Sequence, residues 1–237
     1  MKHLKLFQTQ AEFDASTLEL PNVSFIEETK HLNYQPKPIP PVGACIYGVD
    51  KKFYSCDEWY AGNKSNDEAI GVVFYDGEHD PFVIYPANIV VNRWGAVGTT
   101  ELPKQYDISN ARNDFDGKSN TEIILKAASN YSKVAAKACY DVVFKHGKRG
   151  YLASAGQFYS MCALDVTIPN VINECLEAIG GYVFAASRQV THWTSSIYGR
   201  KTNSSEDHAW AFNMNSNDLK TYADTTSDFC VRPIAEL

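Results

Sequence analysis

The sequence predicts an α+β fold, and three features of the chain lead to this prediction. The run Ala69–Tyr75 is strongly apolar and β-branched, which is typical of a central strand. Apolar side chains then recur at helical spacing between Ile124 and Val142. From Tyr182 onward the chain is rich in Ser, Thr and Asn, and aromatic residues interrupt it at intervals. Such a pattern favours strands joined by polar turns.

The first 41 residues are predicted to form a separate N-terminal arm. The arm has two expected strands, Leu4–Phe7 and Leu20–Ile26, and a capping box at Thr9–Glu12 for a helix of one or two turns. An arm of about 40 residues buries little core by itself, so it is expected to pack on a partner chain or on other copies of itself. Four prolines then favour an extended tether: Pro36, Pro38, Pro40 and Pro41.

The domain that follows, residues 42–237, is expected to begin with strands. Ala44–Val49 and Lys52–Cys56 are predicted to form a hairpin. The central strand, Ala69–Tyr75, ends at a turn made by Asp76 and Gly77. Pro81–Tyr85 is expected to be the next strand.

Three helices are predicted after these strands. The first runs from a capping box at Ser119–Glu122 to about Lys145. The second begins at Ser154, with Gln157 as its capping partner, and the third begins near Pro169 and ends before a glycine pair. Their patterned residues are mostly of core type, so no catalytic face is expected on them.

One strand is expected in the polar C-terminal third. Residues alternate in type from Ala211 to Asn215, so Phe212 and Met214 are predicted to face the core while Asn213 and Asn215 face solvent. We interpret this strand as scaffold with polar side chains on its open face.

Composition and charge exclude several classes of function. The net charge is −6 and the isoelectric point is near 5.5, so a general nucleic-acid-binding surface is not expected. The N-terminus lacks the apolar run of a signal peptide, and no stretch approaches the ~20 apolar residues of a membrane-spanning helix. The cysteines show no zinc-ligand spacing and are expected to be reduced: Cys45, Cys56, Cys139, Cys162, Cys175 and Cys230.

The chain also lacks the common catalytic motifs, so no enzyme activity, cofactor or metal is expected. Asp114–Gly117 has part of a calcium-loop pattern, but Arg112 and Ile123 stand where an EF-hand needs acidic ligands. His208 follows Asp207, but adjacent residues of a strand point to opposite faces, so surface binding is favoured over acid–base catalysis.

Three C-terminal segments carry a resemblance to a known family: Trp193–Tyr198, Ala209–Trp210 and Val231–Ile234. They resemble the C-terminal pattern of C-type-lectin-like domains of the formylglycine-generating-enzyme type. They are similar in particular to the variable proteins of diversity-generating retroelements. Upstream segments agree in order and spacing at 69–74, 116–121, 150–154 and 179–181. The resemblance covers residues 42–237 and implies two to three helices around short twisted antiparallel sheets.

The resemblance also implies roles for individual residues. Trp193, Trp210 and Arg232 would be the framework. The polar and aromatic residues between them would form an exposed ligand-binding face: Ile197, Tyr198, Arg200, Lys201, Asn203, Asp207, His208, Asn213, Asn215, Asn217, Tyr222 and Asp224. Tyr, Asn and Ser suit recognition because they give contact area and adaptable hydrogen bonds. The alternative is that this region is an ordinary solvated set of loops.

The chain departs from the family pattern at two residues. Ile197 stands where the family usually has Glu or Gln before the tyrosine. Family members with oxidase activity bind copper through two nearby cysteines, whereas Cys230 stands alone here. The calcium motifs of animal sugar-binding lectins are also absent, so calcium-dependent sugar binding is not carried over.

A second resemblance concerns the arm, where residues 6–13 and 20–29 resemble leader segments of structural proteins of tailed phages. We therefore expect a virion protein, made in the host cytoplasm, that belongs to a head or tail fibre or appendage. Its expected partners are other virion proteins, through residues 1–41, and a host-surface glycan or protein. A homotrimer is expected by analogy with such appendages. The alternatives are a purely structural decoration protein, a bacterial surface binding protein, and an enzyme that uses Cys230 or His208.

Overall fold

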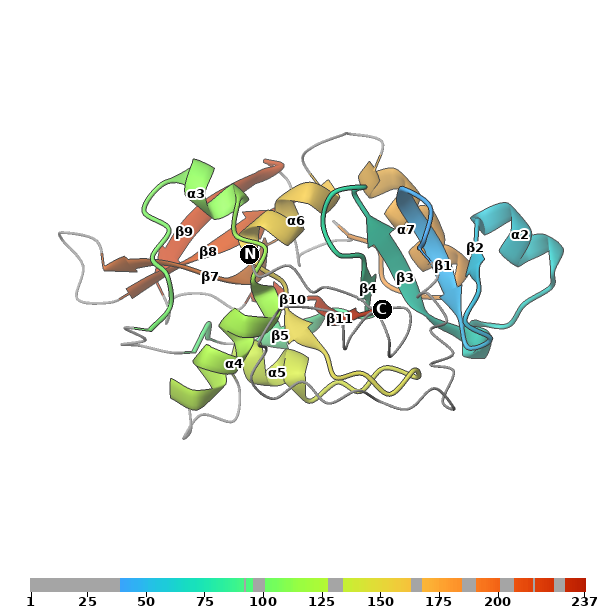
Figure 1. Cartoon of the computed structure of the whole chain (residues 1–237), viewed down its shortest axis with the longest axis horizontal. Helices are drawn as coiled ribbons and strands as arrows, with labels where there is room; N and C mark the ends of the chain where they lie inside the picture. The colour runs from blue at the N-terminus through green and yellow to red at the C-terminus, as the bar shows by residue number, and fades with distance from the viewer. Residues whose placement is uncertain are drawn as a thin grey trace, which may run out of the picture. The chain divides into compact units, whose positions relative to one another are not determined.

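The computed structural model of the chain describes residues 39–91, 93–95, 101–127, 134–162, 168–184, 191–200, 207–214, 216–223 and 229–237 (Figure 1). The chain divides into two units between Pro38 and Ile39, and the second unit runs to Leu237. The strands and the short helix expected before Pro36 lie outside the described residues. The prediction of an α+β fold is confirmed, because the second unit contains two sheets and several helices.

In the part of the chain that the structure describes, the first sheet has six strands, all antiparallel, in the order β2-β1-β3-β4-β11-β6. Its strands are β1 (Gly43–Gly48), β2 (Phe53–Tyr54), β3 (Ala69–Tyr75), β4 (Phe82–Ile84), β6 (Tyr151–Leu152) and β11 (Pro233–Glu236). The predicted hairpin and the two predicted strands after it are thus confirmed as β1 to β4. The strand β11, from the C-terminal end of the sequence, lies between β4 and β6.

The second sheet, as far as its residues are described, has five strands in the order β5-β10-β7-β8-β9. They are β5 (Ile89–Val91), β7 (Thr191–Arg200), β8 (Asp207–Asn213), β9 (Asp218–Ala223) and β10 (Phe229–Val231). Only β10 and β7 pair in parallel, and the other neighbours are antiparallel. The register of β7 against β8 shifts on both sides of Ile197. These irregularities re-aim the side chains of β7 relative to its neighbour.

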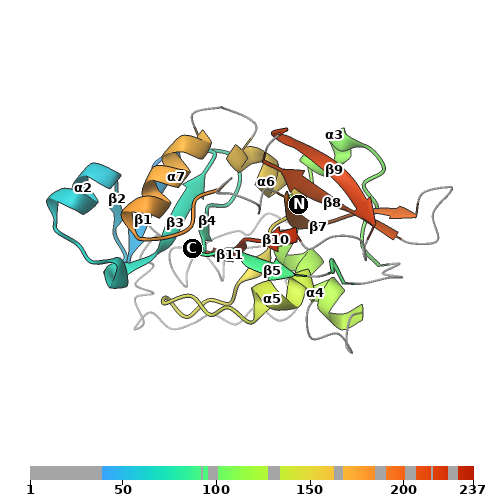
Figure 2. The same cartoon turned by 180° about the vertical axis from the view of Figure 1, so that it is seen from behind.

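Helices cover both sheets (Figures 1 and 2). They are α2 (Cys56–Ala61), α3 (Ile108–Arg112), α4 (Gly117–Ala127), α5 (Ala135–Tyr140), α6 (Ala155–Cys162) and α7 (Ile168–Ala178), with a 3₁₀ turn at Asn66–Glu68. Helix α7 packs on β1 and β3, whereas α3 and α6 lie on one side of the second sheet and α4 and α5 on the other. Among the described residues, no helix has the length and apolarity needed to cross a membrane.

Among the described residues, the core consists of three clusters separated by the sheets. The first joins one face of the first sheet, α6 and α7 to one face of β8 and β9. The second lies between the opposite face of the second sheet and helices α4 and α5. The third covers the remaining face of the first sheet, around Val73 and Phe144. Both sheets are therefore covered by apolar side chains on both faces along much of their length.

The prediction of one long helix from Ser119 to Lys145 is wrong, because two helices, α4 and α5, occupy this stretch. Val134 is extended, with φ −91° and ψ 152°, and pairs with Arg93 in a parallel bridge. The Ala135 N–H then donates to the carbonyl of Arg93, so a new helix begins there. The apolar spacing of the sequence continues across the break and gave no sign of it.

The start of the first predicted helix also needs correction, because α4 begins at Gly117 and not at the Ser119 capping box. The Asn120 N–H donates to the Asp116 carbonyl, which places Ser119 inside the first turn. A Cβ at position 117 would lie 2.3 Å from Oε1 of Gln157, so glycine permits the close approach of α4 and α6.

The second and third predicted helices are confirmed as α6 and α7. Ser154 and Gln157 form the expected reciprocal cap: the Ser154 N–H donates to Gln157 Oε1 at 3.0 Å, and the Gln157 N–H donates to Ser154 Oγ at 3.4 Å. Helix α7 ends at Ala178, and Gly180 follows with a positive φ of 70°. The helices α2 and α3 were not predicted, because six and five residues are too short for a periodic pattern.

The expected alternation on β8 is only partly present. Phe212 is buried as predicted, but Ala211 before it is buried as well, because clusters of apolar side chains cover both faces of the strand. Asn213 and Met214 are both half-buried, and Asn215 lies outside the described residues. The predicted alternation from Ala211 to Asn215 is therefore not observed at its start, where the strand is covered on both faces.

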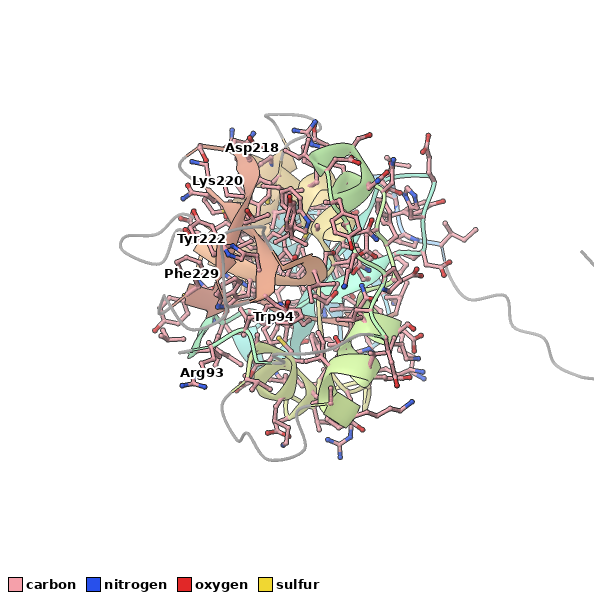
Figure 3. The ribbon with its side chains drawn as sticks, turned by 90° about the vertical axis from the view of Figure 1, so that its left-hand side faces the viewer. Arg93, Trp94, Asp218, Lys220, Tyr222 and Phe229 are labelled. Carbon is pink, nitrogen blue, oxygen red and sulfur yellow. The ribbon has the colours of Figure 1, made fainter. Side chains whose placement is uncertain are left out.

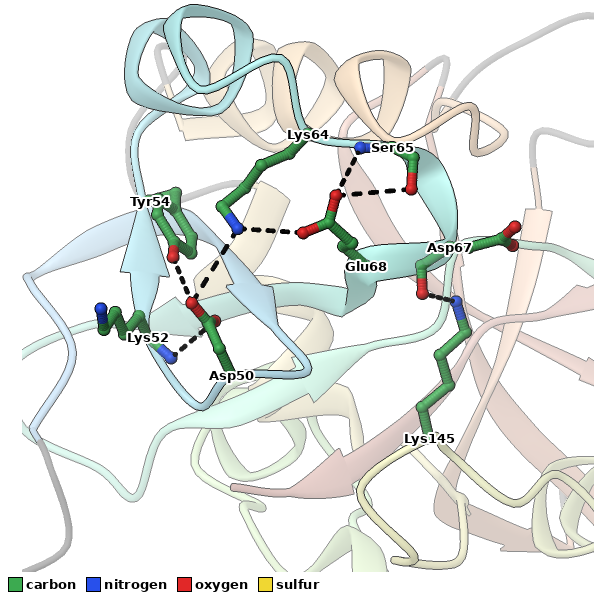
Figure 4. A network of polar contacts seen from close by, with 8 residues as sticks. All are labelled: Asp50, Lys52, Tyr54, Lys64, Ser65, Asp67, Glu68 and Lys145. Carbon is green, nitrogen blue, oxygen red and sulfur yellow. Dashed lines mark hydrogen bonds and ion pairs between the residues drawn. The ribbon is translucent and has the colours of Figure 1, made fainter.

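A polar network holds the end of the first sheet at which β1 and β2 meet (Figure 4). The Lys64 ammonium lies 3.1 Å from a Glu68 carboxylate oxygen and 3.9 Å from one of Asp50. The Tyr54 hydroxyl donates to Asp50 at 2.5 Å. Lys145, which is distant in sequence, donates to the Asp67 carbonyl at 2.7 Å. These contacts connect the β1–β2 turn to the segment after α2.

Candidate ligand-binding surface

The three residues expected to form the framework are all buried. Trp193 and Trp210 are 0% and 6% exposed, and Arg232 is 0% exposed. The Arg232 guanidinium donates to the carbonyls of Tyr85 at 3.1 Å and Tyr182 at 2.7 Å. Burial lowers its pKa to about 9, so it is still charged at neutral pH. Arg232 lies between β10 of the second sheet and β11 of the first, so these hydrogen bonds connect the two sheets to the segment that follows α7.

A buried polar network surrounds Asp114 in the middle of the molecule. One carboxylate oxygen accepts from the Ser196 hydroxyl at 2.5 Å, and the Asn120 amide donates to both oxygens at 3.2 and 3.1 Å. Ser196 Oγ in turn accepts from the Ala155 N–H at 2.8 Å. Burial raises the pKa of Asp114, although these hydrogen bonds oppose the rise. Hydrogen-bond donors of the protein thus surround the Asp114 carboxylate, which resembled a calcium ligand in the sequence. These hydrogen bonds connect helices α4 and α6 to strand β7.

Ile197 is a correction to the expected ligand-binding face. Its side chain is 1% exposed and belongs to the second core cluster, with Trp193 and Ala209. Its carbonyl accepts from the Gln105 N–H at 2.8 Å. The prediction that Ile197 contacts a ligand is therefore wrong, and an apolar residue at this position is explained by packing.

The two expected tyrosine contacts lie on opposite faces of the second sheet. Tyr198 packs with Trp210, with ring centroids 5.9 Å apart, and lies at the first core cluster. Tyr222 packs with the buried Trp193 at 6.2 Å and lies at the second cluster. The residues expected to share one ligand-binding face are thus divided by the sheet itself.

Other expected contacts lie at the two ends of β7 and β8. Arg200 pairs in register with Asp207, and His208 follows, at one end. Asn213 lies at the other end, where its amide donates to Thr191 at 3.2 Å. Asn213 lies six positions along the strand from Asp207, which is a distance of about 20 Å. These two ends cannot contact one small ligand together.

The turn between β8 and β9 holds a further expected contact, Asn217, which has a positive φ of 49°. Asparagine tolerates this conformation better than most residues, so a turn role explains it. The remaining expected contacts lie outside the described residues: Lys201, Asn203, Asn215 and Asp224.

The structure brings together residues from the edge strand β9 and from the inner strand β10, which we name the β9 strip: Asp218, Lys220 and Tyr222 of β9, and Phe229 of β10 (Figure 3). Lys220 is exposed, and Tyr222 and Phe229 are half-buried. Their rings meet edge to face, with centroids 4.7 Å apart, and both pack on the buried Trp193. Of this strip, the sequence predicted only Tyr222.

The flanks of the β9 strip are charged. At one end the Asp218 carboxylate lies 3.3 Å from the Arg112 guanidinium, which stacks on the ring of Tyr159. At the other end lies the exposed Arg93, next to the buried Trp94 (Figure 3). Sequence reasoning missed Phe229 because it precedes two buried residues and has the type of a core residue. Arg93 was missed because its position depends on strand pairing: it lies two residues after Val91 of β5, which pairs with Phe229 of β10.

The features that could support catalysis or metal binding, a reactive cysteine, a group of metal ligands or a cavity, do not coincide with the β9 strip. Burial raises the pKa of the Cys230 thiol to about 11, which keeps it protonated at neutral pH. Among the described residues, no group of three or more His, Cys, Asp or Glu side chains is placed to hold a metal ion. Cavities of about 290, 320 and 260 Å³ are lined by residues outside the β9 strip.

No protein-family model, curated protein or solved structure matches this chain. Its function is therefore inferred from its own residues and their placement.

Proposed function

We propose that this chain is a virion structural protein of a tailed phage, a fibre or appendage component with a C-type-lectin-like domain that attaches to the host surface. The observation that carries the binding role is the β9 strip. Two half-buried aromatic rings, Tyr222 and Phe229, are held on the buried Trp193 beside an exposed lysine. The motifs at Trp193–Tyr198, Ala209–Trp210 and Val231–Ile234 support the lectin-like part of the proposal.

The chemistry of the strip suits a glycan or a protein surface. A rigid aromatic ring gives contact area at a small entropic cost, because it has few rotatable bonds. The packing of Tyr222 and Phe229 on Trp193 fixes both rings before a ligand arrives, which reduces the cost of binding further. Lys220 supplies a positive charge for an acidic group on the partner.

Display on a particle would make a weak contact effective. A homotrimer attached through residues 1–41 would present several copies of the strip to one host cell. Once one copy is bound, the effective concentration of the others is high, so the avidity of the particle exceeds the affinity of one domain. A strip of a few residues is therefore sufficient for attachment.

The second candidate function is a decoration protein without a ligand. It has support in the position of the strip, because β9 is an edge strand and could be covered by a neighbouring subunit of the particle. Under this alternative the strip is buried on the assembled particle, and its side chains are inaccessible to solvent.

The test is binding of the purified protein, multimerised on beads, to cells and surface glycans of candidate hosts. We expect saturable binding that falls at least about tenfold in a Tyr222→Ala/Lys220→Ala variant, since the lost contact area and charge are each worth about 1 kcal/mol. The matched control is Tyr60→Ala/Lys52→Ala, because both residues are exposed and α2 lies at the opposite end of the domain from β9 (Figures 1 and 2).

Two further measurements separate a loss of binding from a loss of folding. Lys220→Glu changes only an exposed side chain, so its effect on binding is independent of the packing of Tyr222. Circular dichroism of each variant checks that it folds. Absence of binding by the multimerised wild type to every host surface, or an equal loss in the control, would reject the attachment function in favour of decoration.

A further inference from the structure

Two thiols from distant parts of the chain lie next to each other. Cys56 is the first residue of α2, and Cys175 lies in α7, 119 positions later. Their Sγ atoms are 3.2 Å apart. Cys56 is half-buried, whereas Cys175 is 1% exposed and packs in the first core cluster. A disulfide bond has its sulfur atoms about 2.05 Å apart, so a movement of roughly 1 Å would join them.

We propose that Cys56 and Cys175 are a site of oxidative modification, at which a low-molecular-weight disulfide converts the two thiols into a disulfide bond between α2 and α7. This inference is independent of the proposed attachment function. It also differs from the sequence-based expectation that all six cysteines stay reduced.

The steps balance with glutathione disulfide as the oxidant. The half-buried Cys56 loses its proton and attacks one sulfur of the oxidant, which forms a mixed disulfide and releases one glutathione. Cys175 then loses its proton and attacks Sγ of Cys56, which releases the second glutathione. The protein loses two protons and two electrons, and the oxidant leaves as two thiols.

The surroundings of the pair set the rate of this reaction. Burial raises the pKa of Cys56, and the nearby charge of Glu174 raises it further. The pKa of Cys175 is raised well above its usual range by the same burial and by Cys56. Because the thiolate is the attacking species, oxidation is slow at neutral pH and quickens as the pH rises.

The bond would anchor a weakly held part of the fold. Helix α2 has only six residues, and Trp59 is its one buried residue. It packs on α7, and it lies at the edge of the domain beside β2, a strand of two residues (Figures 1 and 2). A disulfide that closes a loop of more than 100 residues restricts the unfolded chain strongly, so oxidation stabilises the fold.

The experiment is incubation of the folded full chain with glutathione disulfide, followed by unfolding in urea, alkylation of the remaining free thiols and peptide mass mapping. We expect four alkylated cysteines and one linked pair of peptides, which contain Cys56 and Cys175. The other four thiols are buried and serve as internal controls. The thermal midpoint of the oxidised protein should rise by on the order of 5 °C and return when dithiothreitol is added.

Variants of α7 sharpen the test. Glu174→Gln should speed the loss of free thiols, because it removes a charge that disfavours the thiolate. Glu177→Gln is the matched control on the same helix, because it is also exposed and is not among the groups that affect either thiol. The rate should rise about tenfold per pH unit between pH 7 and pH 8 in the wild type.

Three outcomes would overturn the proposal. The first is a glutathione adduct that persists on Cys56 without a linked pair. The second is a link between Cys56 and Cys45, whose pKa is also affected by the charge of Cys56. The third is no reaction of the folded protein under conditions that oxidise the urea-unfolded chain. All three are read on the wild type, so they do not depend on the folding of any variant.

Discussion

At the scale of single residues, His192 is an ionisable side chain enclosed in the core. It is 0% exposed, lies among the rings of Phe158 and Phe184, and its Nε2 is 3.2 Å from the Asn88 amide oxygen. Burial lowers its pKa from 6.5 to about 3, and the charge of Arg232 acts in the same direction. The imidazole is therefore neutral in the folded state over the whole physiological range.

This burial predicts a loss of stability in acid. Below pH 6.5 the unfolded chain binds a proton at His192, whereas the folded chain binds this proton only below about pH 3. The free energy of unfolding should thus fall by up to about 1.4 kcal/mol for each pH unit between these values. Urea titrations at pH 7, 6 and 5 give the free energy of unfolding at each pH. This free energy should fall less steeply with decreasing pH in His192→Gln than in the wild type. The assignment of this loss to His192 would be contradicted if the pH dependence of the unfolding free energy were unchanged in His192→Gln. It would also be contradicted if the partly exposed control, His79→Gln, changed that pH dependence equally.

A second prediction concerns Asp114. An amide has one acceptor oxygen, whereas Ser196, Asn120 and the Asp116 N–H donate to the two oxygens of the carboxylate. Asp114→Asn should lower the free energy of unfolding at pH 7 by about 1–3 kcal/mol, because its amide group would face these donors. Asp116→Asn, an exposed neighbour, should change it by less than about 0.5 kcal/mol. Similar urea midpoints for the two variants would exclude a structural role for the Asp114 network.

At the scale of elements, β3 is the strand that the sequence indicated most clearly, and Gly71 within it has a steric explanation. A Cβ at this position would lie 2.4 Å from the Ile84 carbonyl oxygen and 2.9 Å from Cγ1 of Val83. At position 71 the neighbouring chain at Val83 and Ile84 therefore leaves no room for a side chain. The apolar run predicted the strand, but only the paired strand explains the glycine.

Replacement of this glycine should separate the two strands. Gly71→Ala is expected to cost about 3 kcal/mol of unfolding free energy, because the added methyl meets backbone that cannot move without loss of pairing. Gly147→Ala is the contrast: its φ of 85° is strained for alanine, but nothing lies within 4 Å of the new Cβ. It should cost about 1 kcal/mol. Thermal unfolding of both variants measures the difference, and a Gly71→Ala variant that is as stable as Gly147→Ala would refute the close approach.

The elements also show where prediction from sequence stops. Local patterns predicted β1, β3, β4, α6 and α7, because hydrophobic spacing and end caps are written in adjacent residues. The break between α4 and α5 depends on Val134 pairing with Arg93, a contact that no local pattern encodes. The same limit applies to the site, where β7 sends Tyr198 and Ile197 to opposite faces and pairing across the sheet brings Phe229 beside Tyr222.

At the scale of the whole molecule, the domain that begins at Ile39 contains every described strand, helix and core cluster. We predict that a chain truncated to residues 39–237 keeps a thermal midpoint within about 2 °C of the full chain. We also predict that it no longer joins the particle, because residues 1–41 are proposed to attach it. Differential scanning calorimetry and analysis of purified particles measure the two effects. An unfolded truncated chain, or one that still joins the particle, would show that the arm has a different role.

The position of β11 has a consequence for how the protein is made. A ribosome produces this strand after every other described strand, yet β11 lies inside the first sheet, where Ile234 pairs with both Ile84 and Tyr151. Until residues 233–236 have emerged, β4 and β6 have no strand between them, and their open edges are exposed to other nascent chains. A chain that stops before residue 233 therefore lacks the strand that joins β4 to β6. The first sheet therefore closes only after this strand has been made, so the pairing of its middle depends on the last described strand of the chain.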